Sequence, residues 1–456
     1  MAWYDTAVFY HIYPLGLCGC PHENPGPDAP VNTSGECFAK LDAWAAHAAA
    51  LGCTAIYLGP LFEAGSHGYD TIDYRTVDRR LGTNEELRQF VANCHARGQR
   101  VVLDGVFNHV GRGFAPFQDL LANREGSRWR DWFSGVNFWG NNEYGDGLSY
   151  DNWGGYNLLV KLNLRNPEVR DYHFESVRYW VEQFDIDGLR LDAADVLDFD
   201  FMRGLRQLAD TVKPEFWLLG EVIHGDYSRW ANGGMLHSVT NYELHKGLWS
   251  GHNDHNYFEI AHSVRRLLGL CGSVKLYTFT DNHDVPRLVN RLKNREHARL
   301  VAMLAYTLPG VPSLYYGSEF GIEGEKAPGS DWPLRPALEL ADYAGAETEN
   351  PLTALYARLG RLKAEHPALS AGAYQELSLT TRQYAFARVG EGETLITLLN
   401  NDDAPARVEC PLPAGGQTVC DALAGCPGQP QIELRLENGR LTAQLPAGGG
   451  AVALVR

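Results

Sequence analysis

The feature that most constrains the fold is a regular alternation of short apolar runs with longer amphipathic segments. Amphipathic segments of helical period occupy residues 37–52, 83–98 and 167–184, and Thr83 is placed to cap the second of them with Glu86. Strands that alternate with helices form parallel sheets, and eight such units predict an α/β fold, a closed (β/α)8 TIM barrel. Eight apolar runs of strand length are present, at residues 7–13, 54–59, 100–107, 186–192, 216–222, 236–242, 273–280 and 311–317.

Two parts of the chain depart from this pattern. Residues 110–166, between the third strand and the third helix, are rich in Trp, Gly, Asn and Asp, and are too long for a structureless loop, so we expect an inserted subdomain over the barrel mouth. After about residue 369 the pattern changes to alternating strands and turns, which predicts a C-terminal all-β sandwich domain at 370–456. The catalytic barrel is then expected to comprise residues 1–109 and 167–369.

Composition excludes several classes of partner. Of the 456 residues 45% are hydrophobic and 21% charged, which is typical of a folded globular protein. The formal net charge of −16 argues against a nucleic acid or an anionic membrane as partner, because both require a basic face. No apolar stretch is long enough to span a membrane, and the first ten residues lack the features of a secretory signal. We therefore expect a cytoplasmic protein.

The cysteines do not predict a disulfide framework or a metal site. There are nine, an odd number without framework spacing, which is typical of reduced thiols. Cys18, Cys20 and His22 form one short cluster without a second matching pair, so we predict no metal site there.

Polar residues gather where four of the expected strands end. Any one of them alone could merely cap the following helix, but four coincidences on the catalytic rim of a barrel point to an active site. The residues are Asp104 with Asn108 and His109 after the third strand, Asp192 beside Arg190 on the fourth, Glu221 on the fifth, and Asp284 with Asn282 and His283 after the seventh.

Carboxylates that converge from different strands suit glycoside hydrolysis, in which one acts as an acid and another attacks the sugar. Glu221 follows the apolar residues 216–219, and a second carboxylate nearby would raise its pKa further, as a general acid requires. Arg190 would favour the ionised form of Asp192, which suits a nucleophile.

Five segments resemble the α-amylase family of glycoside hydrolases. DGVFNH (104–109), GLRLD (188–192), GEV (220–222) and FTDNHD (279–284) are similar to the four ordered signature segments of that family. HGYDTIDYRTVDRRLG (67–82) is similar to its stretch after strand two. The resemblance extends over essentially the whole chain, and the segments are specific as a set although each alone would be weak.

The resemblance implies a role for each matching residue. Asp192 would be the nucleophile, Glu221 the general acid/base, and Asp284 the residue that binds the sugar and stabilises the transition state. Hydrolysis with retention through a covalent glycosyl-enzyme is implied, with the two catalytic carboxyl groups about 5 Å apart. The implied substrate-binding residues are Tyr69, Asp70, His109, Arg190, His224 and His283, with Asp104 and Asn108 as structural support.

Within the family, LVKLNLRNPEVRDYH (159–173) and GEVIH (220–224) resemble the cyclomaltodextrinase, neopullulanase and maltogenic amylase branch. That branch usually carries an extra N-terminal β domain that helps to form dimers and narrows the cleft. Here the first expected strand begins at residue 7, which leaves the oligomeric state and a preference for cyclic dextrins open. The expected substrate is an α-glucan oligosaccharide with α-1,4 bonds, since a small residue after the nucleophile, here Ala193, accompanies that linkage in related glucosidases.

Other interpretations stay open from sequence alone. A transglycosylase of the same family (glucanotransferase, sucrose phosphorylase or trehalose-forming enzyme) would share the barrel and differ in the acceptor. A non-catalytic carbohydrate-binding protein would have lost the carboxylates that this chain retains. The aromatic residues of the insert form its core or, for one or two of them, line sugar subsites. No cofactor is expected to be required; calcium is an open alternative, because Asn108 matches a position that often binds it in amylases.

Overall fold

The computed structural model describes residues 1–413 and 418–456. Its centre is an eight-stranded parallel sheet in the order β10-β11-β1-β2-β3-β7-β8-β9. A parallel bridge between Thr240 and Tyr277 joins its two edges, so the (β/α)8 barrel predicted from the sequence is confirmed. The barrel strands are β1 (Phe9–Ile12), β2 (Ala55–Leu58), β3 (Arg100–Gly105), β7 (Gly188–Leu191), β8 (Trp217–Gly220), β9 (Ser238–Val239), β10 (Tyr277–Phe279) and β11 (Val311–Tyr315).

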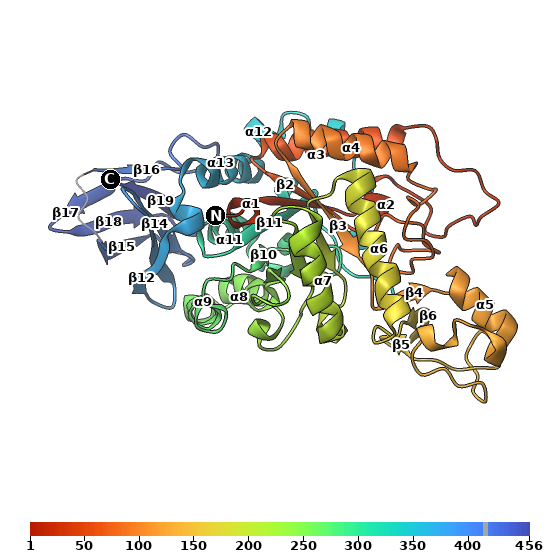
Figure 1. The fold of residues 1–456 in the computed structure, drawn as a ribbon. Coiled ribbons are helices and arrows are strands. Elements are labelled where there is room, and N and C mark those ends of the chain that lie inside the picture. Colours follow the sequence, from red (N-terminus) through yellow and green to blue (C-terminus); the bar gives the residue numbers. More distant parts are fainter. Residues whose placement is uncertain (414–417) are drawn as a thin grey trace.

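Helices surround this sheet (Figure 1). Thr83 caps α4 as expected, because its hydroxyl accepts a hydrogen bond from the backbone of Glu86 while the Glu86 side chain accepts one from Thr83 N. The helices outside the insert are α1 (Trp3–Thr6), α2 (Pro14–Leu17), α3 (Glu36–Ala50), α4 (Asn84–Ala96), α6 (Pro167–Phe184), α7 (Phe199–Val212), α8 (Tyr242–Asn253), α9 (Tyr257–Cys271), α10 (Leu288–Arg291), α11 (Ala298–Thr307), α12 (Ala346–Glu349), α13 (Pro351–Glu365) and α14 (Ala368–Ala371).

The period of two along each strand separates the inside of the barrel from its outside. On β7, Leu189 and Leu191 belong to the apolar layer shared with the helices, whereas Arg190 lies on the opposite face. Phe9 and Trp217 stack in the barrel interior with ring centroids 4.8 Å apart. Apolar side chains therefore fill one end of the barrel, and charged side chains occupy the carboxyl ends of the strands.

The segment between β3 and α6 forms a small antiparallel sheet, β4-β6-β5, with one helix beside it. Trp132 and Phe133 are buried in it, whereas Trp139 is 96% exposed. Figure 1 places this segment at the opposite end of the barrel from the C-terminal strands. Its elements are β4 (His109–Gly111), α5 (Ala115–Asn123), β5 (Asn152–Trp153) and β6 (Tyr156–Lys161).

The C-terminal strands form two antiparallel sheets, β12-β13-β14-β19-β16 and β15-β18-β17. A separate apolar cluster that includes Ile396, Leu398, Leu441 and Ala453 lies between them, so the predicted all-β sandwich is confirmed. The strands are β12 (Ala373–Leu379), β13 (Gln383–Val389), β14 (Thr394–Asn400), β15 (Ala406–Pro411), β16 (Val419–Asp421), β17 (Leu434–Glu437), β18 (Arg440–Leu445) and β19 (Gly450–Val455).

In the part of the chain that the structure describes, no helix combines the length and the apolar character needed to cross a membrane.

Candidate active site

Arg190 is the centre of a polar network at the carboxyl ends of the barrel strands. It lies on β7, the strand between β3 and β8, and is 3% exposed. Its Nη1 donates to both carboxylate oxygens of Asp104, at 2.9 and 3.0 Å, and to Asp192 Oδ1 at 3.0 Å. Its Nη2 lies 2.9 Å from Glu221 Oε2. Three carboxylates therefore share one guanidinium, and these charged hydrogen bonds fix their side chains relative to one another.

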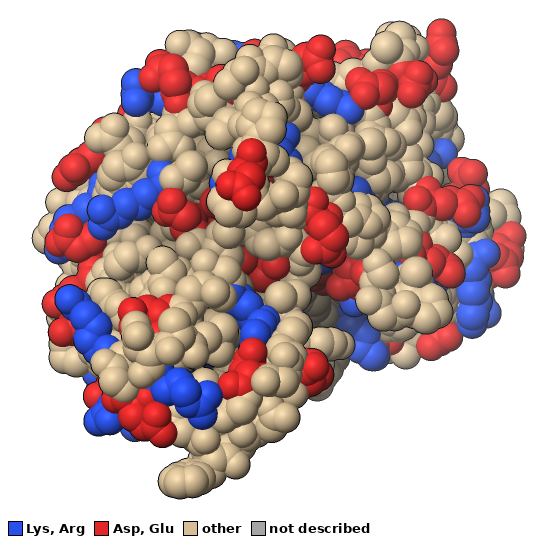
Figure 2. All heavy atoms as spheres, turned by 90° about the vertical axis from the view of Figure 1, so that its right-hand side faces the viewer, with Lys and Arg blue, Asp and Glu red and all other residues tan. Residues whose placement is uncertain are grey.

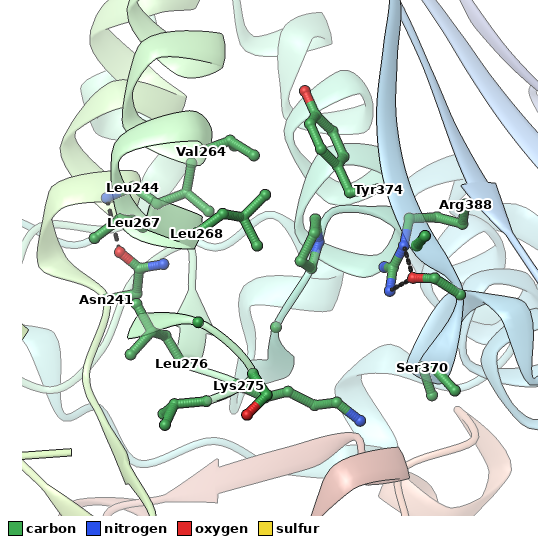
Figure 3. Close-up of a pocket in the computed structure, with 18 of the residues that line it drawn as sticks. Asn241, Leu244, Val264, Leu267, Leu268, Lys275, Leu276, Ser370, Tyr374 and Arg388 are labelled. Atoms are coloured by element: carbon green, nitrogen blue, oxygen red, sulfur yellow. Dashed lines mark hydrogen bonds between the residues drawn. The ribbon is translucent and has the colours of Figure 1, made fainter. Parts of the chain in front are cut away.

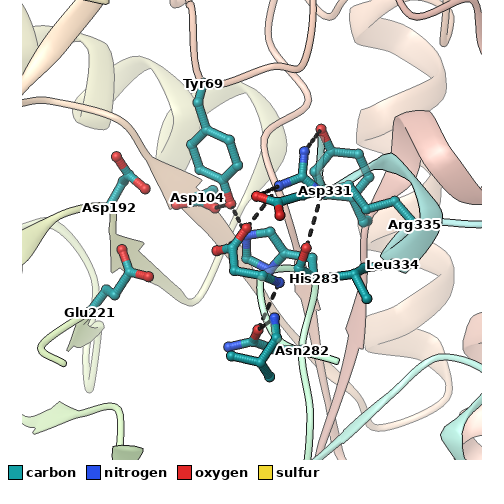
Figure 4. Close-up of polar contacts among 12 residues, drawn as sticks. Tyr69, Asp104, Asp192, Glu221, Asn282, His283, Asp331, Leu334 and Arg335 are labelled. Carbon is teal, nitrogen blue, oxygen red and sulfur yellow. Dashed lines mark hydrogen bonds and ion pairs between the residues drawn. The ribbon is translucent and has the colours of Figure 1, made fainter. Parts of the chain in front are cut away.

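The backbone turns sharply directly after Asp192. Ala193 has φ 46°, a left-handed conformation that costs a residue with a side chain about 1–2 kcal/mol. In this turn the Ala193 N–H donates to Glu221 Oε2 at 3.0 Å. Figure 4 shows Asp192 and Glu221 next to each other, across from Tyr69 and His283. The strained turn therefore helps to aim Glu221 into the same space as Asp192.

Tyr69, His283 and Asp284 form the opposite wall. The Tyr69 hydroxyl donates to Asp104 Oδ2 at 3.1 Å and contacts His283 Nε2, and the two rings stack with centroids 5.6 Å apart. His283 Nε2 also lies 2.9 Å from Asp284 Oδ2. The residues predicted from strands two, three, four, five and seven are thus brought into one site.

Arg335 belongs to this wall although nothing in the sequence pointed to it. Its Nη2 donates to Asp284 Oδ1 at 2.8 Å and its Nε donates to the backbone oxygen of His283 at 3.1 Å. Its Nη1 donates to the Tyr13 hydroxyl at 3.2 Å. Arg335 lies in the loop after β11, outside any strand or motif, so only the tertiary fold could reveal it.

His109 presents a neutral imidazole to the site. Burial lowers its pKa to about 3, so the ring is uncharged at neutral pH. The Asn108 amide nitrogen lies 3.2 Å from His109 Nδ1 and can only donate, which places the ring proton on Nε2. Nε2 has no hydrogen-bond partner in the described structure and lies 3.8 Å from Asp192 Oδ2. The ring of Trp153, on β5, is 5.9 Å from that of His109.

The charge states of Asp192 and Glu221 differ from the sequence-based expectation in one respect. Arg190 lowers the pKa of Asp192, as expected, but burial of the carboxyl outweighs this effect. Burial raises the pKa of Asp192 well above its usual range, and the neighbouring carboxylates of Glu221 and Asp104 raise it further. Burial also raises the pKa of Glu221, although Arg190 opposes the shift. The two groups titrate as a pair that holds a proton more tightly than free carboxyls do. One proton on the pair is what an acid and a nucleophile together require.

Asp284 behaves in the opposite way. Burial raises its pKa, but His283 and Arg335 outweigh burial, so the pKa lies well below the usual range. Asp284 is therefore ionised throughout the physiological range and supplies a fixed negative charge to the site.

Two further predicted residues lie apart from this network. Asp70 is buried and accepts from the Ser66 hydroxyl at 2.9 Å, within the loop that carries Tyr69. His224 is exposed on the loop after β8 and makes no hydrogen bond within the described residues, so its role in substrate binding stays a prediction.

Figure 2 shows the insert-bearing side of the molecule, where Lys and Arg are scattered among Asp and Glu.

Calcium at Asn108 stays an open alternative, although two polar groups of this residue have partners within the protein. Its amide nitrogen faces His109, and its backbone oxygen accepts from Leu162 N at 3.0 Å. Within residues 1–413 and 418–456, no group of three or more His, Cys, Asp or Glu is arranged to hold a metal ion. A calcium ion needs six to eight oxygen ligands, so no catalytic step is assigned to a metal here.

Known proteins are similar to this chain in both sequence and fold. The family model for the alpha amylase catalytic domain matches residues 46–368. A cyclomaltodextrinase from a Bacillus species is 32% identical over 432 residues, which are 90% of this chain and 75% of that protein.

Two solved structures are also similar. One, a cyclomaltodextrinase, superposes with a TM-score of 0.85 at 29% identity over 100% of this chain and 78% of its own. The other, the cyclic alpha-maltosyl-(1→6)-maltose hydrolase from Arthrobacter globiformis, has a TM-score of 0.81 at 26% identity over 100% of both chains. Together with the barrel and the carboxylates at its rim, these matches show that the chain belongs to the alpha-amylase family of retaining glycoside hydrolases.

Proposed function

We propose that this enzyme hydrolyses α-1,4-glucosidic bonds in maltooligosaccharides and related short α-glucans. The observation that carries the proposal is the pair Asp192 and Glu221, which share the Arg190 guanidinium at contacts of 3.0 and 2.9 Å. Both carboxyls have raised pKa values, and they lie across from Tyr69 and His283 (Figure 4). This arrangement supports an acid and a nucleophile that act on one sugar ring.

The proposed reaction has two displacements. The Asp192 carboxylate attacks C1 of the glucosyl ring while the protonated Glu221 gives its proton to the glycosidic oxygen, and the leaving sugar departs with a free hydroxyl. The Glu221 carboxylate then takes a proton from water, whose oxygen attacks C1 and releases Asp192. The configuration at C1 is retained, and one water molecule is consumed for each bond cleaved.

Three residues hold the sugar in this proposal. The Tyr69 ring stacks on its face, the free Nε2–H of His109 donates to a ring hydroxyl, and the ionised Asp284 accepts from sugar hydroxyls and opposes the positive charge that develops at C1. Arg190 holds the acid and the nucleophile in register.

The first experiment follows the products from maltotriose by proton NMR. Release of maltose and glucose with the α-anomer appearing first is expected, and Asp192→Asn should abolish it while the protein stays folded. No turnover of maltotriose or of cyclodextrin would overturn the hydrolase proposal, and appearance of longer oligosaccharides at high maltose would favour transglycosylation.

A second candidate is cleavage of α-1,6 bonds. One observation favours it. The cyclic alpha-maltosyl-(1→6)-maltose hydrolase from Arthrobacter globiformis matches this chain over 100% of both proteins. The cyclomaltodextrinase structure, by contrast, is matched over only 78% of its own length. Panose contains one bond of each type, and glucose is released whichever bond breaks. The disaccharide product therefore decides: maltose would indicate α-1,6 cleavage, and isomaltose would indicate α-1,4 cleavage.

We also propose a cytoplasmic location and no requirement for added metal. All nine cysteines are free thiols, which supports a reducing compartment. The α-glucan oligosaccharide is the one partner that we propose.

A further inference from the structure

A cavity lies between the barrel helices and the C-terminal β domain. It has a volume of about 390 Å³, within the range of small-molecule sites. The segment that precedes β10, the helices α8 and α9, and the strands β12 and β13 all contribute to it. In Figure 1 these elements lie on the side of the C-terminal strands, away from the insert that flanks the active site. The mechanism proposed above does not use this cavity.

The walls of this cavity differ in chemistry. Leu244, Val264, Leu267 and Leu268 form an apolar wall on α8 and α9. In Figure 3 the charged ends of Lys275 and Arg388 lie on the opposite side, and Ser370 also lines the cavity there. One side of the space therefore suits a hydrocarbon group and the other side suits a polar group.

The polar side is cationic. No described residue that lines the cavity is Asp or Glu, in a chain that has 56 acidic and 40 basic residues. Ser370 is 3% exposed, and its hydroxyl has no hydrogen-bond partner in the described structure. An anion is the ligand that such a wall would attract.

Arg388 and its neighbour Lys363 have little compensating negative charge. Arg388 is 3% exposed and donates only to backbone oxygens in the described structure, to Gly372 O at 3.0 and 3.2 Å and to Thr307 O at 3.1 Å. Lys363, on α13, is also 3% exposed and donates to Leu369 O at 3.3 Å. Buried cations are costly unless an anion pairs with them.

Lys275 is only partly compensated. Its Nζ donates to Asp5 O at 3.1 Å and lies 3.6 Å from Asp5 Oδ1. The three cations are close enough to affect one another, because burial, together with the charges of Arg388 and Lys275, lowers the pKa of Lys363 to about 7. The region thus carries three basic side chains against one carboxylate, and a bound anion would relieve their repulsion.

We propose that this cavity binds an aliphatic carboxylate of medium chain length. The carboxylate would pair with Lys275 and Arg388 and accept from the Ser370 hydroxyl, and the chain would pack on Leu267 and Leu268 of α9. A singly charged head group suits the site better than a phosphate dianion, because Asp5 already neutralises part of the charge of Lys275.

The test measures octanoate binding to the full-length protein by isothermal titration calorimetry. We expect saturable binding of one octanoate per chain with a Kd below about 1 mM. Octanol lacks the charge and inorganic phosphate lacks the chain, so each should bind at least tenfold more weakly. Equal affinity for octanol would overturn the anionic half of the proposal, and equal affinity for phosphate would overturn the aliphatic half.

Two variants locate the site. Lys275→Met keeps most of the length of the side chain and removes its charge, and Leu268→Glu places a negative charge on the apolar wall. Each should weaken octanoate binding at least tenfold. Lys293→Met is the matched control, because that side chain is 73% exposed and outside the cavity, and it should bind octanoate as the unmodified protein does. Unchanged binding in both cavity variants, or no octanoate binding at all, would overturn the proposal.

Discussion

Arg335 donates from Nη2 to Asp284 Oδ1 at 2.8 Å, and so connects the loop after β11 to the loop after β10. This contact, with the His283 imidazole on the other oxygen of Asp284, keeps the carboxylate ionised and fixed in direction. Arg335 is thus a positioning residue that acts on the sugar through Asp284.

Replacing Arg335 with Met is expected to lower kcat on maltotriose by about 10²-fold, a loss of the size seen when one preorganised electrostatic group is removed. Because Arg335 lowers the pKa of Asp284, its loss should raise that pKa and move the acidic limb of the pH–rate profile to higher pH. Arg335→Lys keeps the charge and should restore the position of that limb in part. An unchanged pH profile in Arg335→Met would contradict a positioning role.

Glu221→Gln tests the proton donor. On maltotriose, kcat should fall by about 10³-fold, since general acid catalysis contributes about 10²–10⁴. On α-glucosyl fluoride, whose leaving group needs no proton, formation of the glycosyl-enzyme should be nearly unaffected. Its breakdown normally needs Glu221 to deprotonate a water molecule. Added azide needs no deprotonation, so it should attack C1 in place of water and restore turnover. Equal losses on the two substrates would argue against Glu221 as the acid.

Asp192→Asn should stabilise the protein while it abolishes activity. Burial raises the pKa of Asp192, so the unfolded chain releases this proton at lower pH than the native protein, and the unfolding free energy falls as pH rises above the unfolded pKa of about 4. The neutral amide removes this penalty, so Tm should be higher than that of the unmodified protein at pH 7. The gain should shrink at pH 4, where the penalty is not yet present, and thermal unfolding at both pH values measures it. A lower Tm at pH 7 would be the opposite of what the buried pair implies.

Trp153→Ala tests whether the insert contributes a sugar subsite. The Trp153 ring is 39% exposed and lies 5.9 Å from that of His109, so a sugar ring bound beside His109 could stack on it. Loss of the aromatic surface should raise KM for maltohexaose about fivefold, a cost of about 1 kcal/mol. Trp139→Ala is the control on the same subdomain, with a 96% exposed side chain, and should leave KM unchanged. Equal effects of the two substitutions would point to a change in the whole insert.

Dialysis against EDTA should leave kcat and the unfolding temperature unchanged, because no group of three or more His, Cys, Asp or Glu in the described residues is arranged to hold a metal ion. Assays with and without added calcium measure this. Restoration of lost activity by calcium alone would reveal a site that the Asn108 contacts do not indicate.

The barrel could be predicted because each of its strands has a recognisable pattern within a few consecutive residues. Each strand is a short apolar run, and the order of residues on β7, an arginine between two leucines, is enough to identify an inward face. The strands proved shorter than the runs: residues 236–242 contribute only Ser238–Val239, since the residues that follow turn at once into the cap of α8.

The site could be predicted as far as it depends on strand ends. Asp104, Arg190 and Glu221 meet because parallel strands end at one rim. Arg335 could not be found, because its contact with Asp284 joins two loops whose paths depend on the complete fold. The raised pKa of Asp192 could not be predicted either, since a single sequence does not show that this carboxyl is buried beside other carboxylates.

The sharing of Arg190 also has an evolutionary consequence. A substitution at Asp104, Asp192 or Glu221 frees N–H donors of Arg190, and the remaining carboxylates can accept hydrogen bonds from them. The effect of one substitution therefore depends on whether another of the three residues has already been replaced. Charge changes at these three positions are therefore epistatic. In a lineage that altered the chemistry of this site, the order in which these substitutions arose would therefore matter.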